Sequence, residues 1–143
     1  MKSYKNLSPD QKQALVRLPV YISLLAATDN LLDEAERLSA TKLAHTKSFS
    51  CEPLLAEFYR EADKYFESNM IQLGRDLPKA AGTREAAILK EIRIMENILS
   101  KLGPDYALAM HRSLKTFKNH VAKAHHSVIE DFVLPIAIPG LTD

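Results

Sequence analysis

The stretch ATDNLLDEAE, residues 27–36, joins two helical patterns and places four carboxylates within eight positions. Asp33 and Glu36 have the D-x-x-E spacing of a capping box, in which the Asp accepts from backbone N–H groups that open a helix and the Glu reaches back. Asn30 tolerates left-handed backbone angles and can therefore close the preceding helix. The stretch predicts a tight corner between two helices.

The carboxylates leave two interpretations of this corner open. In the first, the corner is only a well-capped turn. In the second, Asp29, Asp33 and either Glu34 or Glu36 also hold a hard cation, because carboxylate oxygens are the ligands that such ions prefer. The stretch does not match an EF-hand loop, since Leu31 stands where that loop needs an oxygen ligand.

The composition is that of one folded helical domain. The chain has 143 residues, of which 46% are hydrophobic and 26% charged, which argues against disorder. Glycine occurs only four times and tryptophan is absent, while Ala, Leu, Lys and Glu are common, which favours helix. We expect a single domain over residues 1–143, with an N-terminal arm at 1–7 and an apolar, proline-containing tail at 132–143.

Charge and hydropathy exclude several classes of protein. The net charge of +1 provides no overall field that would attract nucleic acid or a membrane surface. The longest apolar stretches, at 18–27 and 132–138, are too short to span a bilayer. No apolar run follows the first residues, so no signal peptide is expected, and Cys51 alone excludes an internal disulfide. We expect a soluble cytoplasmic protein.

The first predicted helix begins at Ser8, a good N-cap, with Pro9 at the first helical position. Its apolar stripe continues past Pro19 as far as Leu25. Proline removes one backbone hydrogen bond, so we expect Pro19 to kink this helix rather than end it.

Hydrophobic periodicity predicts four further helices, which gives an all-α, single-domain bundle of about five main helices. They are expected over residues 34–47, from Pro53 to about 73, from Thr83 as N-cap to 102, and from 104 to about 126, with a loop at 48–52 and a linker at 74–82. Gly103 is typical of a residue that ends a helix, and Pro104 is typical of the first position of the next helix.

The helix from 53 to 73 has the clearest division into two faces. Tyr65 and Phe66 fall on its apolar face, whereas Glu57 and Glu61 fall on the polar face at spacings that allow pairing across one turn. We expect the aromatic face to be packed core, with a ligand pocket as the alternative.

The histidines of the last helix are candidate metal ligands. His111, His125 and His126 fall on its polar side with Lys115 and Lys118, and lysine neighbours disfavour a bound cation. We interpret this side as a solvated basic face. No aromatic residue interleaves it for base stacking, so nucleic-acid binding is not expected.

Two titratable residues lie closer to the predicted core. His120 is at the margin of the apolar stripe of its helix, and Glu91 falls inside the apolar arc of the preceding one. Three explanations stay open: a rim carboxylate that reaches water, a Glu91–His120 pair, and a distant ligand of the Asp29 corner.

No catalytic signature is present. The sequence contains no phosphate-binding glycine loop, no H-E-x-x-H and no G-x-S-x-G. Cys51 lies beside Glu52, which should raise the pKa of its thiol and weaken it as a nucleophile. We expect the protein not to be an enzyme.

The corner resembles the signature of the TerB-like (tellurite-resistance) family, a turn of the form A-D-G-x-I-D-x-x-E between two long helices. Thr28 is inserted before Asp29, and Asn30 stands where the family usually has glycine. The similarity covers roughly residues 15–43. The matching residues are Ala27, Asp29, Leu32, Asp33 and Glu36.

This resemblance implies an all-helical bacterial domain associated with stress responses, including those to tellurite and other toxic anions, and with acidic residues implicated in metal binding. Carried over by position, Asp29, Asp33 and Glu36 would be the metal ligands. Oxygen ligands alone suit Ca²⁺, Mg²⁺ or Mn²⁺ better than a soft metal.

Two functions are therefore expected as alternatives. The first is a non-catalytic, TerB-like module that binds a hard divalent cation at the corner. The second is an interaction or scaffolding domain with a purely structural corner, in which the tail at 132–143 mediates self-association or binds a protein partner.

Overall fold

The computed structural model describes residues 4–27 and 32–124, and within these ranges every regular element is a helix. The fold class predicted from periodicity, an all-α bundle, is therefore confirmed. The 3-10 turns are η1 (Tyr4–Asn6) and η3 (Pro53–Leu55), and the α-helices are α1 (Pro9–Leu15), α2 (Leu18–Ala26), α3 (Glu34–Ser50), α4 (Ala56–Asp76), α5 (Ala81–Ser100) and α6 (Pro104–Ala124).

The predicted first helix is present with its kink. Ser8 caps α1 in a full capping box: its N–H donates to Gln11 Oε1 at 3.0 Å and its Oγ accepts from the Gln11 N–H at 3.2 Å. Regular helix stops at Leu15 and resumes at Leu18, so that α1 and α2 form one helix bent by 22°. Pro19 causes the bend, because it has no N–H to donate to the preceding turn.

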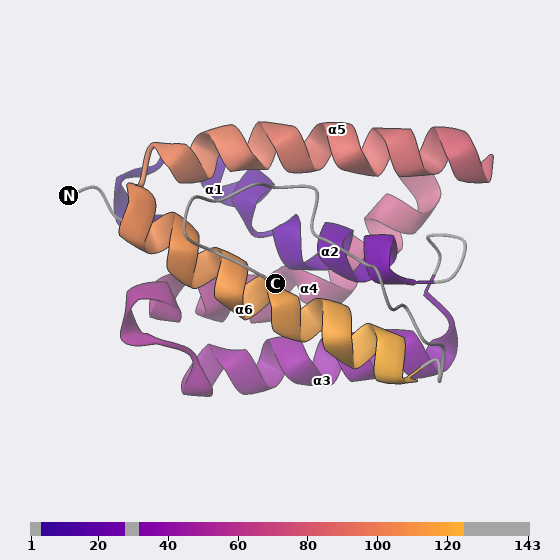
Figure 1. The fold of residues 1–143 in the computed structure, drawn as a ribbon, viewed down its shortest axis with the longest axis horizontal. Coiled ribbons are helices and arrows are strands. Elements are labelled where there is room, and N and C mark those ends of the chain that lie inside the picture. The colour runs from indigo at the N-terminus through magenta and orange to yellow at the C-terminus, as the bar shows by residue number, and fades with distance from the viewer. Residues whose placement is uncertain (1–3, 28–31, 125–143) are drawn as a thin grey trace.

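Helix α2 is the centre of the bundle. All of its residues, Leu18–Ala26, are buried, including Ser23, whose Oγ donates to the Pro19 carbonyl at 2.8 Å. A helix that is apolar on every side requires neighbours on every side. Figure 1 shows how they are arranged: α5 and α3 run along opposite edges of the molecule, α6 crosses from one edge to the other, and α2 lies between α5 and α6 and packs on both.

Helix α3 is longer than predicted. It continues through residues 48–50, which were expected to be loop, and ends at Ser50. The hydroxyl of Ser50 donates to the Thr46 carbonyl at 2.8 Å, so these serines support the last turn instead of breaking it. The turn before α4 is accordingly shorter, with Cys51 as the C-cap of α3 and Pro53 opening η3.

The linker predicted at 74–82 is also shorter. Helix α4 runs through Gly74 to Asp76, and α5 begins at Ala81 with Ala80 rather than Thr83 as its N-cap. The guanidinium of Arg84 donates to the Lys79 carbonyl at 2.7 Å and the Pro78 carbonyl at 3.4 Å. This buried side chain organises the turn, which explains why α5 starts without a side-chain cap.

The predicted end of one helix before Gly103 and the start of the next at Pro104 are confirmed. Gly103 has a φ of 97°, which glycine adopts readily, and Pro104 opens α6. None of the described helices is long and apolar enough to cross a membrane. The tail at 132–143 and the self-association expected of it lie outside the described residues.

Candidate functional site

The capping box predicted at the corner is present. Asp33 is the N-cap of α3: its N–H donates to Glu36 Oε1 at 2.9 Å, and its Oδ1 accepts from the Glu36 N–H at 2.7 Å. Glu36 is only 1% exposed, whereas Asp33 is exposed. The corner therefore holds two carboxylates within one turn, one buried and one facing solvent, at the positive end of the α3 dipole.

The third predicted ligand, Asp29, and the predicted helix-closing residue, Asn30, lie outside the described residues. Helix α2 itself ends at Ala26, and Ala27 is extended. Among residues 4–27 and 32–124, no group of three or more His, Cys, Asp or Glu side chains could hold a metal. The structure thus brings Asp33 and Glu36 together, and Asp29 stays a predicted partner.

His111 does not belong to the basic face of the last helix, and that prediction is wrong. Its side chain is fully buried, and its Nε2 lies 2.9 Å from Glu96 Oε2 on α5. The reason is its register: it precedes the buried Leu114 by three residues, so it lies beside the buried stripe of α6. The pair fastens α6 to α5.

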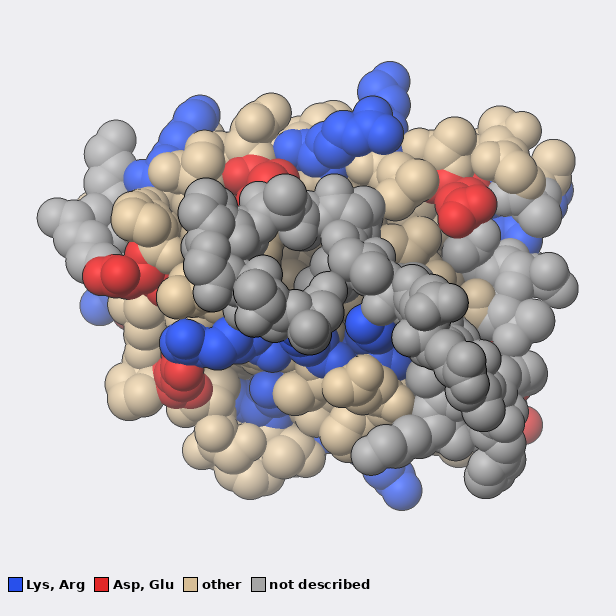
Figure 2. All heavy atoms as spheres, in the orientation of Figure 1, with Lys and Arg blue, Asp and Glu red and all other residues tan. Residues whose placement is uncertain are grey.

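Part of the predicted basic face exists. Figure 2 shows Lys and Arg side chains gathered across the middle of the face over which α6 runs. On α6 itself, Arg112 is exposed, with its guanidinium 3.3 Å from Glu52 Oε1, and Lys115 and Lys118 are half-buried. His125 and His126 lie outside the described residues.

Glu91 and His120 are not paired. His120 is exposed and its Nδ1 lies 2.9 Å from the carbonyl of Thr116, one turn back. The charge of Glu91 instead affects the pKa of Tyr21 in α2. Burial first and then the charge of Glu91 raise the pKa of Tyr21 to about 12.

The pKa of Cys51 is raised, as predicted. The main cause, however, is burial of the thiol, and the charge of Glu52 contributes less. Its raised pKa leaves this thiol a weak nucleophile.

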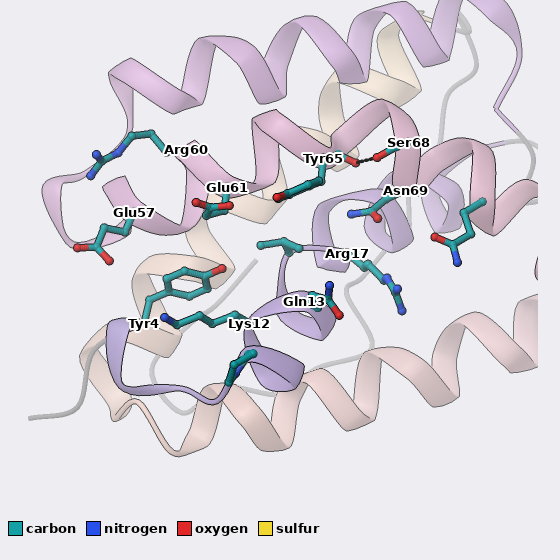
Figure 3. Close-up of a pocket in the computed structure, with 13 residues that line it drawn as sticks. Tyr4, Lys12, Gln13, Arg17, Glu57, Arg60, Glu61, Tyr65, Ser68 and Asn69 are labelled. Atoms are coloured by element: carbon teal, nitrogen blue, oxygen red, sulfur yellow. Dashed lines mark hydrogen bonds between the residues drawn. The ribbon is translucent and has the colours of Figure 1, made fainter.

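A cavity of about 710 Å³ lies between α4 on one side and α1 with η1 on the other, and we call it the α1–α4 groove. Its volume is in the range of small-molecule sites. Figure 3 shows its labelled side chains, those of α4 facing those of η1 and α1. The lining residues are Tyr4, Pro9, Lys12, Gln13, Val16, Arg17, Glu57, Arg60, Glu61, Tyr65, Ser68, Asn69 and Gln72.

Contacts at one end hold the two walls of the groove together. The Tyr4 ring packs edge-on against Phe58 with centroids 5.9 Å apart, and Lys5 Nζ lies 2.9 Å from Glu57 Oε1. Both contacts join η1 to the first turn of α4. Beyond them α1 packs on α5 rather than on α4, which leaves the space between α1 and α4 open.

The electrostatic field differs between the two ends of the groove. Burial, then the charges of Glu61 and Glu57, raise the pKa of Tyr4 to about 12. The charge of Arg17 has the opposite effect on the neighbouring Tyr21, where it lowers the pKa and partly offsets the rise. Acidic charges therefore act on Tyr4 at one end of the groove, and the basic charge of Arg17 acts on Tyr21 near the other end.

Sequence reasoning did not find this groove. Tyr65 was expected in the core, but it is 43% exposed and lines the groove, so that expectation is wrong. The signal that could have found it is a polar stripe at helical spacing through Glu57, Glu61, Tyr65 and Asn69, each four residues after the last.

Comparison with known proteins finds no family model, no curated protein and no solved structure that matches this chain. The TerB-like resemblance expected from the corner residues therefore stays a prediction.

Proposed function

We propose that this chain is a non-catalytic, TerB-like domain of a cytoplasmic bacterial stress response, and that it binds a hard divalent cation at the corner before α3. The observation that carries the proposal is the buried carboxylate of Glu36 beside Asp33, in a turn that fits the TerB-like spacing. Glu36 is 1% exposed and accepts a hydrogen bond from the Asp33 N–H, so the capping box holds its carboxylate in place at this corner.

The capping box decides which atoms would hold the ion. It uses Asp33 Oδ1 and Glu36 Oε1 for backbone hydrogen bonds. A cation would be bound through Asp33 Oδ2 and Glu36 Oε2, with Asp29 as the third acidic ligand. An all-oxygen set of this kind suits Ca²⁺, Mg²⁺ or Mn²⁺.

The proposal is tested by thermal melting with each of these ions and with the double variant Asp33→Asn, Glu36→Gln. Asn caps a helix as well as Asp, and Gln serves in a capping box as Glu does, so the variant keeps the cap and loses both charges. An ion at 100 times its Kd stabilises by about 2.7 kcal/mol, which is roughly 8 °C in Tm for a chain of this size. We expect that shift in the natural chain and not in the variant.

A matched control is Asp10→Asn, which removes an acidic residue from the first turn of α1 and leaves the corner unchanged. This control should keep the ion-dependent shift in Tm. The proposal is wrong if none of the three ions raises the Tm of the natural chain, or if the double variant shifts as much as the natural chain does.

A further inference from the structure

Two charged side chains that face the α1–α4 groove, one at each end, have no ion pair within the described ranges, and the other unpaired charges of the lining are the cations Lys12 and Arg60. These are Glu61 of α4 and Arg17, the N-cap of α2, and neither side chain makes a hydrogen bond or salt bridge to another described residue. Glu57, by contrast, is paired with Lys5 at 2.9 Å. Glu61 is thus the one carboxylate of the described lining without an ion pair, and Arg17 is the unpaired cation at the other end.

The other cations of the lining do not neutralise Glu61. Lys12 Nζ lies 5.8 Å from the centroid of the Tyr4 ring, a cation–π contact. Arg60 extends away from the middle of the groove, as Figure 3 shows. The pKa of Tyr4 is raised by burial and then by the charges of Glu61 and Glu57, so both carboxylates act on this end of the groove.

The two charges lie at different ends of the groove. Glu61 is at the end that holds Tyr4, and Figure 3 shows Arg17 across from Asn69. Asn69 comes eight residues after Glu61 in α4, which is about 12 Å along a helix. A ligand that contacts both charges must therefore be elongated.

Asn69 is an independent sign of a ligand at the positive end. Its side chain lines the groove and is only 9% exposed, and its amide Nδ2 has no hydrogen-bond partner in the described part of the chain. Buried amide donors are nearly always paired, because leaving one without an acceptor is costly. A ligand oxygen next to Arg17 would supply that acceptor.

We propose that the α1–α4 groove binds a short linear peptide of three or four residues by its free termini, with the ammonium at Glu61 and the carboxylate at Arg17 and Asn69. An extended chain spans about 3.3–3.6 Å per residue, so three or four residues cover the distance between the two ends. A single amino acid is too short to reach both charges. Gln13 and Gln72 lie along the walls, where their amides can pair with peptide groups.

The test is calorimetric titration of the full chain, in the presence of a chelator, with trialanine, N-acetyl-trialanine and trialanine amide. The chelator keeps any cation from the corner, so a failure here is distinct from a failure of the cation proposal. Trialanine should bind, and each blocked terminus should weaken binding about tenfold or more, because each removes one charge pair. No heat with trialanine up to about 10 mM, or equal binding of all three peptides, overturns the proposal.

Two variants assign each terminus to its residue. Glu61→Gln should weaken trialanine about tenfold and leave N-acetyl-trialanine unchanged, whereas Arg17→Gln should weaken trialanine and leave the amide unchanged. Glu85→Gln and Arg37→Gln are matched controls on exposed positions outside the groove and should change nothing. If both groove variants weaken the binding of all three peptides equally, Glu61 and Arg17 do not bind the peptide termini and the proposal is wrong.

Discussion

The corner before α3 and the α1–α4 groove arrange charge in opposite ways. At the corner, Asp33 and Glu36 have the same sign and are gathered by the backbone of a single helical turn. In the groove, Glu61 and Arg17 have opposite signs and come from different helices. A compact pair of like charges suits a small cation, and a separated pair of unlike charges suits an elongated zwitterion. The spacing and sign of the charges therefore distinguish the two expected ligands.

The largest expected effect concerns the closed end of the groove. Tyr4 is 5% exposed and packs against Phe58, so Tyr4→Ala should lower the free energy of unfolding by about 3 kcal/mol, measured by urea denaturation. Tyr4→Phe keeps the ring and should stay close to the natural chain. If Tyr4→Ala is within about 0.5 kcal/mol of the natural chain, η1 does not hold this end together.

Titration of Tyr4 is expected to lower the stability of the fold at alkaline pH. The folded chain keeps the Tyr4 phenol protonated up to a pKa of about 12, whereas an unfolded chain releases that proton near the ordinary value of 10. The folded state therefore binds more protons between pH 10 and 12, and stability falls as pH rises through this window, by on the order of 2 kcal/mol.

Urea denaturation at pH 9 and pH 11.5 measures this loss, and Tyr4→Phe is the control because it cannot titrate. The variant should lose less stability than the natural chain over that range. Identical losses would show that Tyr4 is not responsible.

A smaller effect is expected from the helix cap at the corner. Asp33→Ala removes the acceptor of the Glu36 N–H and should cost about 1 kcal/mol, whereas Asp33→Asn should cost little. Thermal melting in chelator separates this capping role from any bound ion. Equal destabilisation by Ala and Asn would mean that the charge of Asp33, and not its capping geometry, stabilises α3.

The smallest effects on stability are expected from the groove charges. Glu61→Gln and Arg17→Gln should each change the free energy of unfolding by less than about 0.5 kcal/mol, because neither side chain forms an ion pair with a described residue. A loss above about 2 kcal/mol in either variant would show that the charge supports the fold rather than a ligand.

Local features of the fold could be predicted from the sequence, because their partners are a few residues away. The caps at Ser8 and Asp33, the bend at Pro19 and the stop at Gly103 all depend on side chains or backbone groups within one turn. The start of α5 could not be predicted, because the side chain of Arg84 reaches back over the turn and replaces a conventional cap.

The position of His111 and the whole groove required the tertiary structure. His111 is polar, but its register on α6 places it against Glu96 in the core. The groove combines residues 4–17 with residues 57–72, which only the packing of η1 on α4 brings together. At the corner, the Asp33–Glu36 capping box could be predicted because both residues lie in one stretch of sequence.

The most direct test of the account is calorimetric titration of Ca²⁺, Mg²⁺ and Mn²⁺ into the natural chain and into Asp33→Asn, Glu36→Gln. The account predicts saturable binding of at least one ion at a single site in the natural chain and none in the variant, although both melt at similar temperatures in chelator. The absence of binding in the natural chain, or equal binding in both, would contradict it.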